Sequence, residues 1–470
     1  MNNTSIVALL IGLILSGAPT YAQSYQIAPN PNPSGSTISV TGFGAENLSS
    51  FENDGILVIE GTLSNSGILN SNAGGSLTIS GSGALDNYGA LNNAGNFQFS
   101  VDAHTGTLNN YNTFTNSSTD NGNYLGILNN FSTFNNSGVL YTVFAHNTGD
   151  AANNTGATLG TVNLRNSGTL NNSGTVVTDA VGTITNTGTL NNAGILNNTP
   201  SGQLDNSGIL NNSGTLYTGQ SLNNSGTLNN TSNLRSARQT NNSGSLNNFG
   251  ILEIYYPEDT LNNTGTLNNT GTMHNDGTIA GTGTYIQAAG QTVNNGSLSQ
   301  ASIQFDGGGL SGTGTITGDV SIGSGASVNP GNSPGTMTIN GNFTSEGTLA
   351  FEIAGLGSGL YDFLDIDGNA SFSGGNIQFD FIDGFNAAAG NYWDFMSADT
   401  ISGWDTLSFT FNGLGAELGW SFAHLDTGEE RLWITSNPVT PVPEPGSYAM
   451  LMTGLGLFGL ASRRKKKYVA

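Results

Sequence analysis

A leucine recurs every six residues along the middle of the chain, within the unit Leu-Asn-Asn-Ser/Thr-Gly-Thr/Ile. The step of six is unbroken from Leu204 to Leu234. A six-residue step would rotate an α-helix by about 600° and scatter the leucines around its axis. A glycine in each unit would also cost a helix about 1 kcal/mol. The pattern therefore excludes a long helix and predicts short β-strands.

Each hexad is expected to form one strand and one corner. The leucine of Thr-Leu-Asn points to one side of the strand, and its two neighbours point to the other. Asn-Ser/Thr-Gly is expected to make the corner, because Asn and Gly tolerate positive φ angles. A longer interval of 20 residues separates Leu108 from Leu128 and Ile184 from Leu204. We therefore expect turns of about 20 residues in which leucines stack and asparagine amides form ladders along the axis.

A parallel β-helix satisfies both intervals. The 240 residues from Gly61 to Gln300 correspond to about 12 turns, or about 58 Å at the usual strand spacing. Strict hexads with about 18 residues per turn would favour the left-handed hexapeptide helix, whereas the longer interval and the slips in phase favour the right-handed form. The repeats also resemble those of filamentous-haemagglutinin and autotransporter passengers, which are right-handed. Low-complexity disorder is the alternative, but it would not require a regular leucine.

Alternating strands replace the hexads in residues 301–437. They are expected at 347–353, 376–382 and 430–435. The run Pro-Gly-Asn-Ser-Pro-Gly-Thr after Asn329 resembles an element near the C-terminal end of autotransporter passengers. The resemblance implies that the solenoid continues here and ends in an aromatic β cap, which would cover the strand edge of the last turn. All four tryptophans of the chain lie in this part: Trp393, Trp404, Trp420 and Trp433.

Residues 1–22 have the form of a secretory signal peptide. Ile6–Leu15 is an apolar run that is too short to span a bilayer, and the small residues after it fit cleavage after Ala22. The first five residues contain no Lys or Arg, which is unusual for a signal, and a buried N-terminal strand or helix is the alternative. A Pro- and Asn-rich segment, 23–50, then leads into the hexad region, 51–300.

Three elements follow one another in residues 438–470. Val442–Pro445 is stiff and extended, because proline fixes its own φ and biases the residue before it away from a helix. Residues 446–462 are apolar and just long enough for a short transmembrane helix. The next five residues are cations, which are expected to stay in the cytoplasm and stop transfer through the inner membrane: Arg463, Arg464, Lys465, Lys466 and Lys467.

The order of Pro443-Glu444-Pro445, an apolar helix and a basic cluster resembles the PEP-CTERM sorting signal of Gram-negative bacteria. The resemblance implies that an exosortase recognises Pro443, Glu444 and Pro445 and that the chain is its substrate. It also implies an inner-membrane intermediate, followed by a location at the cell surface or in the extracellular matrix. Family members often accompany exopolysaccharide production, so exopolysaccharide is an expected partner. An ordinary tail anchor is the alternative reading.

The charge of the chain excludes several functions. It has 9 Lys+Arg against 31 Asp+Glu and a formal net charge of −22. A nucleic-acid partner is not expected, because neutralising phosphates requires basic side chains. The chain has no cysteine, which excludes disulfides and Cys-ligated zinc or iron–sulfur sites. Before the basic tail there are four cationic side chains: Arg165, Arg235, Arg238 and Arg431.

Pectate-lyase-like enzymes also use parallel β-helices, and they resemble one another in combining calcium-binding acids with Arg or Lys. Arg235 and Arg238 are close in sequence but have no acid cluster beside them. The four histidines are isolated and lack metal-ligand spacing: His104, His146, His274 and His424. We therefore predict a protein without catalytic residues or cofactors. A lyase or glycosidase is the alternative, since a glycosidase needs only two carboxylates.

Asp362, Asp365 and Asp367 are the best candidates for a metal site. Asp365 and Asp367 are expected on one strand face with a glycine turn after them, and oxygen ligands suit calcium. The distal Glu that would complete an EF-hand loop is missing, so solvated carboxylates on an outer strand face are the favoured reading. Tyr255 and Tyr256 are candidates for stacking on sugars, although a core or cap role is favoured for them and for the tryptophans.

Together these features predict an exported, non-enzymatic surface or matrix protein that is sorted by exosortase. Its expected role is adhesive or structural and linked to exopolysaccharide or biofilm. A passenger-like adhesin for host or partner-cell proteins shares the fold and stays open as another reading. A polysaccharide-processing enzyme is the competing class, and two carboxylates about 5–10 Å apart in a groove would favour it.

Overall fold

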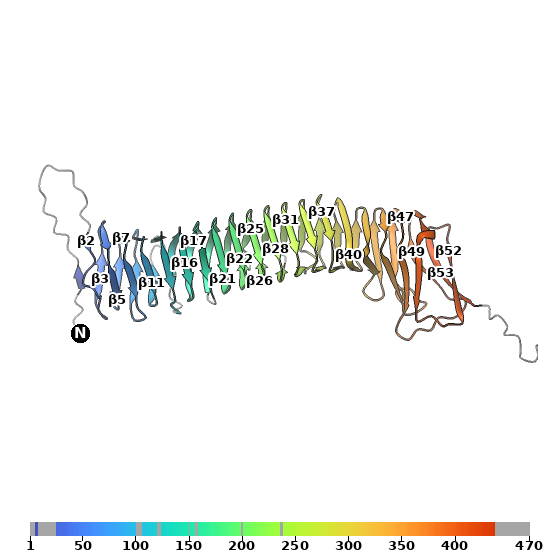
Figure 1. Cartoon of the computed structure of the whole chain (residues 1–470), viewed down its shortest axis with the longest axis horizontal. Coiled ribbons are helices and arrows are strands. Elements are labelled where there is room, and N and C mark those ends of the chain that lie inside the picture. The colour runs from blue at the N-terminus through green and yellow to red at the C-terminus, as the bar shows by residue number, and fades with distance from the viewer. Residues whose placement is uncertain are drawn as a thin grey trace, which may run out of the picture.

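In the computed structural model, the chain forms a long β-solenoid of about 15 turns, with almost no helix (Figure 1). The strands along its body pair in parallel. The prediction of an all-β parallel β-helix is confirmed, while the hand of the coil stays a prediction. The structure describes residues 5–7, 25–99, 106–119, 124–149, 151–155, 158–198, 201–235 and 238–437.

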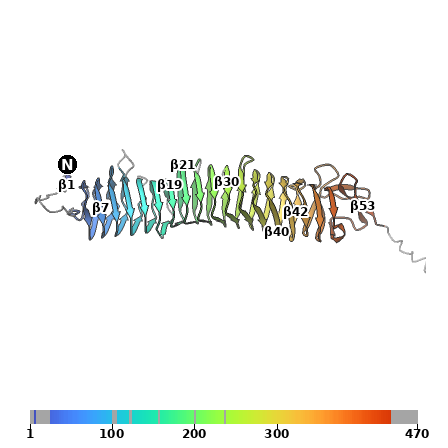
Figure 2. The same cartoon turned by 90° about the horizontal axis from the view of Figure 1, so that it is seen from above.

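Three parallel sheets run along the solenoid, and each regular turn adds one strand to each sheet. β24 (Gln203–Asn206), β25 (Ile209–Asn212) and β26 (Thr215–Thr218) make one turn, and each pairs with the strand 18 residues further along the chain. The pairing places Leu204 beside Leu222, so the leucines stack as predicted. One hexad is therefore one strand and one corner, and the turns form an evenly spaced row (Figure 2).

The number of residues per turn varies along the coil. The strand registers pair Leu108 with Leu128, which is the predicted interval of 20 residues, but they pair Leu85 with Leu108, which is an interval of 23. Strands stay in register across these turns, so the additional residues lie in the corners. Twelve successive pairings lead along one sheet from β7 (Thr62–Asn65) to β39 (Ser297–Ser299), in agreement with the predicted number of turns.

Hexad leucines fill the interior of the solenoid. Leu204, Leu210 and Leu216 are fully buried. In β28 (Thr227–Asn230), with the sequence Thr-Leu-Asn-Asn, the leucine and the second asparagine are buried while the other two residues lie outside. Each buried leucine contributes about 1.5–3 kcal/mol relative to an exposed one, and the contribution repeats in every strand.

The second asparagine of each hexad forms the predicted amide ladder, inside the solenoid. Asn206 Nδ2 donates to Asn224 Oδ1 at 2.7 Å and to the carbonyl oxygen of Thr227 at 3.0 Å. Asn206 Oδ1 accepts a hydrogen bond from Asn186 Nδ2 at 2.7 Å. Because both amide protons and the oxygen are bonded, the side chain can be buried without an unsatisfied polar group. The hydrogen bond to Thr227 also fixes the corner of the following turn.

Hexad glycines have a different role from the predicted one. Gly194 and Gly214 are not among the glycines with positive φ. A Cβ atom on Gly214 would instead lie 2.0 Å from the carbonyl oxygen of Gly194, one turn earlier, and a Cβ on Gly194 would lie 2.0 Å from that of Gly174. The prediction that the corner depends on positive φ was wrong. The corner requires glycine because the backbones of successive turns contact each other there.

Beyond the hexads, the three parallel sheets continue and three antiparallel strands follow. The predicted strands correspond to β45 (Thr348–Ile353), β48 (Asn376–Phe381) and β53 (Glu429–Ser436). β53 pairs antiparallel with both β49 (Tyr392–Ser397) and β52 (Leu418–His424). Aromatic rings gather beside these strands, with centroids about 5–6 Å apart: Phe379, Phe395, Trp404, Phe409 and Phe422.

The predicted membrane elements lie largely outside the described residues. Of the signal peptide, the structure describes Ser5–Val7, a strand that pairs with β3 (Thr37–Val40). The apolar stretch 446–462 lies outside the described residues. Within the described part of the chain, none of the helices has the length and apolar character needed to cross a membrane.

Candidate functional site

The predicted sorting residues Pro443, Glu444 and Pro445 and the basic residues 463–467 lie outside the described residues. The described part ends at Asn437, just after β53. This is the opposite end of the solenoid from β2 (Tyr25–Gln26) (Figure 1). The sites that can be built from geometry are therefore on the solenoid and beside its C-terminal antiparallel strands.

The three aspartates considered for a metal do not converge. Asp365 and Asp367 share the outer face of β46 (Phe363–Asp367), as predicted, but Asp362 is buried on the inner side. Asp362 accepts hydrogen bonds from the backbone N–H groups of Gly335, at 2.7 Å, and Glu352, at 2.8 Å. The favoured reading of a solvated carboxylate is therefore wrong for Asp362. The described residues contain no group of three or more His, Asp or Glu side chains suited to a metal ion.

Burial changes the titration of Asp362. It raises the pKa of the Asp362 carboxyl from 3.8 to about 7, and the nearby Glu352 charge acts in the same direction. The two backbone hydrogen bonds lower the pKa and oppose this shift. The carboxyl holds two chain segments together inside the fold, so its raised pKa has a structural cause.

A cluster of polar and aromatic residues lies in the middle of the solenoid. The strand register places Arg235, Glu253 and His274 in one outward column. The Arg235 guanidinium carbon lies 4.3 Å from the ring centroid of Tyr255 and 5.2 Å from that of Tyr256. Both tyrosines are about half exposed, so the favoured core or cap role is wrong for them. Arg235 packs against both rings, and neither tyrosine lines one of the two hollows described below.

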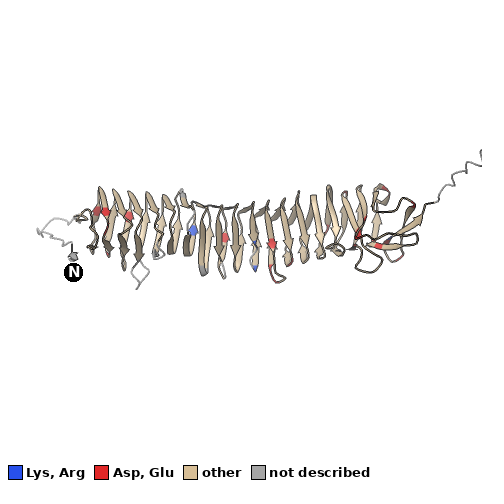
Figure 3. Cartoon of the chain, turned by 90° about the horizontal axis from the view of Figure 1, so that it is seen from below, with Lys and Arg blue, Asp and Glu red and all other residues tan. Residues whose placement is uncertain are grey.

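Charged residues are sparse along the solenoid (Figure 3). Two of the histidines have no acidic partner within 4 Å among the described residues: His146 and His274. His146 has a lowered pKa because of burial and the nearby Arg165 charge. His424 does have a partner, since its Nδ1 lies 2.7 Å from Glu430 Oε1. His104 lies outside the described residues.

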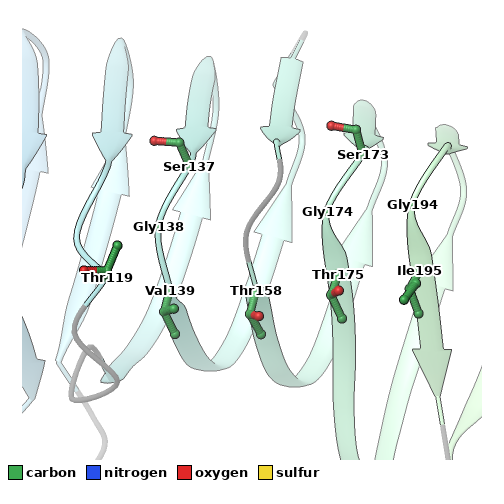
Figure 4. Close-up of a pocket in the computed structure, with 10 residues that line it drawn as sticks. All are labelled: Thr119, Ser137, Gly138, Val139, Thr158, Ser173, Gly174, Thr175, Gly194 and Ile195. Atoms are coloured by element: carbon green, nitrogen blue, oxygen red, sulfur yellow. The ribbon is translucent and has the colours of Figure 1, made fainter.

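One hollow runs over the corners of successive turns and encloses about 420 Å³. Its lining consists of Ser, Thr, Gly, Val and Ile residues, including Ser137, Val139 and Ile195 (Figure 4). None of these side chains titrates near neutral pH or carries a charge. The hollow therefore offers hydroxyl and methyl groups but no acid or base for catalysis.

A second hollow, the C-terminal cleft, encloses about 430 Å³ beside β49 and β53. We define it by six of its lining residues: Tyr361, Asn391, Tyr392, Trp393, Asp394 and Arg431. The antiparallel pairing aligns Asp394 directly with Arg431. Arg431 Nε donates to Asp394 Oδ1 at 2.6 Å, and Nη2 donates to Oδ2 at 2.9 Å. The two side chains form a flat, bidentate ion pair of the strongest hydrogen-bonding type.

Aromatic side chains flank this ion pair. The Arg431 guanidinium carbon lies 4.3 Å from the centroid of the Tyr392 ring, and the Trp433 ring lies 4.8 Å from Tyr392. Tyr392 is 46% exposed, whereas Trp393 is buried and donates from Nε1 to the carbonyl oxygen of Gly355 at 2.7 Å. The core role favoured for the tryptophans therefore holds for Trp393. That hydrogen bond holds the loop between β45 and β46 against the cleft.

The electrostatics of the cleft follow from its packing. Burial raises the pKa of Tyr361, and the nearby Asp394 charge raises it further. The hydrogen bond with Asp394 raises the pKa of Arg431. The ion pair is therefore charged at neutral pH but has no net charge. The arrangement provides donors, acceptors and an exposed ring at one place.

Sequence reasoning missed Asp394 and Tyr392. Arg431 was noted as a cation and Trp433 as an aromatic residue, and both lie on the same face of a strand that was correctly predicted. Tyr392 and Asp394 alternate in the same way on β49. This alternation was the signal in the sequence that could have placed both side chains on one face of a strand. Their pairing across 37 residues could not be derived without the antiparallel register.

A comparison with known protein families identifies the C-terminal segment. Residues 441–465 match the family model described as the PEP-CTERM protein-sorting motif. No curated protein matches the chain. The matched segment contains Pro443, Glu444 and Pro445, the apolar stretch and the first of the basic residues. The chain therefore carries a PEP-CTERM sorting motif next to a β-solenoid body, which marks it as an exported protein sorted toward the cell surface by exosortase.

Proposed function

We propose that this protein is a non-enzymatic, adhesive or structural component of the cell surface or extracellular matrix that binds and organises exopolysaccharide. The observation that carries the proposal is the combination of the sorting motif with a long, regular solenoid. Such a body is a stiff rod whose surface chemistry repeats at every turn. A surface scaffold needs this property, whereas an enzyme needs one site.

The outer surface of the solenoid supports polysaccharide binding. The first asparagine of each hexad faces outward, and in one sheet each Nδ2 donates to the Oδ1 of the turn before it at 2.8–3.0 Å. This outer ladder consists of Asn135, Asn153, Asn171, Asn191, Asn211, Asn229, Asn247 and Asn268. Uncharged amides offer both donors and acceptors, which suits the hydroxyl groups of neutral polysaccharides.

The contents of the two hollows support a role without catalysis. Hydrolysis of a glycosidic bond normally needs two carboxyl groups on either side of the bond. The lining of the C-terminal cleft contains one, Asp394, and that carboxylate is held by Arg431. The lining of the hollow over the corners contains none.

For the route to the surface, we propose that residues 446–462 cross the inner membrane as a helix while residues 463–467 stay in the cytoplasm. Exosortase then acts at Pro443–Pro445. The strands β49, β53 and β52 and their aromatic cluster would cover the last turn of the solenoid. A covered edge would prevent end-to-end pairing with other chains during export.

The test compares the full-length protein with a variant in which Pro443, Glu444 and Pro445 are replaced by alanine. Surface and matrix fractions would be probed by immunoblotting in strains with and without exopolysaccharide synthesis. We expect the wild type in the matrix when polysaccharide is made, and a loss of at least tenfold in either the variant or the strain without polysaccharide. Pro438→Ala, which lies before the matched segment, should leave the distribution unchanged.

Two outcomes would contradict the proposal. Equal matrix retention of the wild type with and without polysaccharide would exclude a polysaccharide-dependent role. Wild-type surface levels of the triple-alanine variant would show that the sorting motif does not deliver the protein.

A further inference from the structure

We propose that the C-terminal cleft is a binding site for one neutral sugar unit of a polysaccharide. This inference deepens the proposed function and rests on it for the identity of the polymer. The solenoid faces provide many weak contacts, whereas the cleft provides one site with fixed geometry. It is built from two strands and two loops, which come together only in the folded chain.

The polar groups of the cleft suit a pair of neighbouring hydroxyls. The Arg431–Asp394 ion pair presents donors and acceptors in one plane, and its geometry is already set by two hydrogen bonds. Asn391 Oδ1 accepts from the backbone N–H of Ala388 at 2.7 Å, which fixes the side chain. Arg431 Nη1 and Asn391 Nδ2 have no hydrogen-bond partner among the described residues. Since each sugar hydroxyl both donates and accepts, these free donors and the carboxylate lone pairs can be used together.

The aromatic part of the cleft suits the C–H face of a sugar ring. Tyr392 keeps 46% of its surface exposed, although the Arg431 guanidinium carbon lies 4.3 Å from its ring centroid and the Trp433 ring centroid lies 4.8 Å away. The face of an aromatic ring carries partial negative charge, and it attracts the weakly positive hydrogens of a C–H surface. An aromatic surface beside a few fixed polar groups is the usual composition of a small-ligand site.

The charge balance favours a neutral ligand. Arg431 is compensated by Asp394, so no net positive charge remains to hold a phosphate or a uronate. The acidic surface of the whole protein, with a net charge of −22, would also repel such anions. An apolar ligand would leave Arg431 Nη1 and Asn391 Nδ2 without partners, which is costly.

The experiment uses the full-length protein in a detergent without a sugar headgroup. Methyl glucoside, methyl galactoside and methyl mannoside would be titrated by calorimetry and by saturation-transfer NMR, with glucuronate and inorganic phosphate as charged probes. We expect saturable binding of at least one neutral glycoside, weakened at least tenfold by Tyr392→Ala and by Arg431→Gln. Tyr256→Ala removes a similarly exposed tyrosine in the solenoid and should leave the affinity unchanged.

A more conservative variant protects the test against misfolding. Asn391→Asp keeps the oxygen that accepts from Ala388 but removes the two free protons, so the loop should keep its shape. We expect this variant to unfold at the wild-type temperature and to bind the glycoside at least fivefold more weakly. Unchanged affinity in the correctly folded Asn391→Asp and Tyr392→Ala proteins would overturn the inference.

Other outcomes separate this inference from the proposed function. Matrix retention of a wild type that binds none of the neutral glycosides would overturn the sugar site and leave the matrix role in place. Saturable binding of phosphate or glucuronate alone would also overturn it. Glycoside binding that depends on Tyr392, in a protein that the matrix does not retain, would support the site and reject the matrix role.

Discussion

At the scale of single residues, the solenoid depends as much on the hexad glycines, which have no side chain, as on the buried hexad leucines. The hexad leucines could be assigned to the interior from the sequence, because a six-residue step on a strand keeps them on one side. The glycine could not be explained in the same way. Its role depends on the distance between turns, since a Cβ on Gly214 would lie 2.0 Å from the oxygen of Gly194.

Glycine substitutions test this role. Gly214→Ala should destabilise the protein by about 2 kcal/mol or more, because the methyl group must displace a backbone oxygen and disturb the pairing of two turns. Gly74→Ala is the matched control, since a Cβ there meets no atom within 4 Å and its φ is not positive. That change should be neutral or slightly stabilising, because alanine restricts the unfolded chain. Chemical denaturation of both variants measures the difference, and similar midpoints would contradict the steric explanation.

At the scale of the element, inner and outer asparagines form ladders that run in opposite directions. Inside, an amide donates to the following turn, as Asn206 does to Asn224. Outside, an amide donates to the preceding turn, as Asn211 does to Asn191. The side-chain dipoles of the two kinds of ladder therefore oppose each other. Where an inner ladder begins, the first oxygen lacks a donor among the described residues, as at Asn93 and Asn275, so a long unbroken ladder leaves fewer such oxygens.

The two ladders should respond differently to alanine. Asn206→Ala leaves Asn186 Nδ2 and Asn224 Oδ1 buried without their partner, at a cost of about 1–3 kcal/mol for each group. Asn211→Ala leaves partners on the surface that water can satisfy, so the loss should stay below about 1 kcal/mol. Thermal and urea unfolding of the two variants would show the difference. A larger loss for Asn211→Ala would mean that the outer ladder contributes more to stability than the inner one.

Repetition explains which elements the sequence could predict. Strand positions, stacked leucines and amide ladders follow from the hexad, because each physical rule applies again in every unit. The turn length was harder to predict, since the interval between paired residues varies from 17 to 23 along the sheet from β7 to β39. The C-terminal cleft lies where the repeat has ended. Asp394 and Arg431 meet through an antiparallel pairing across 37 residues, and no local pattern encodes that register.

At the scale of the whole molecule, the acidic composition and the buried carboxyl groups both make the folded state less stable as the pH rises. The net charge of −22 opposes compaction at neutral pH. Burial raises the pKa of Asp259, Asp362 and Glu430 above the usual values. A carboxyl whose pKa is higher in the folded than in the unfolded state binds its proton more tightly when folded. The folded state is therefore stabilised as the pH falls from neutral toward 4.

The contribution of Asp362 to the pH dependence of stability can be tested alone. Its pKa of about 7 in the folded protein and 3.8 in the unfolded chain define the window. Within it, the unfolding free energy should fall as the pH rises, by an amount on the order of a few kcal/mol at most. The full-length protein should therefore unfold at a lower temperature at pH 8 than at pH 5.

Asp362→Asn should flatten this dependence, whatever its effect on absolute stability, because the amide does not titrate. Asp367→Asn, at an exposed position on the same strand, should keep the wild-type slope. If Asp362→Asn and wild type have the same slope between pH 5 and pH 8, the buried carboxyl is ionised throughout that range, and its two backbone hydrogen bonds outweigh the cost of its burial.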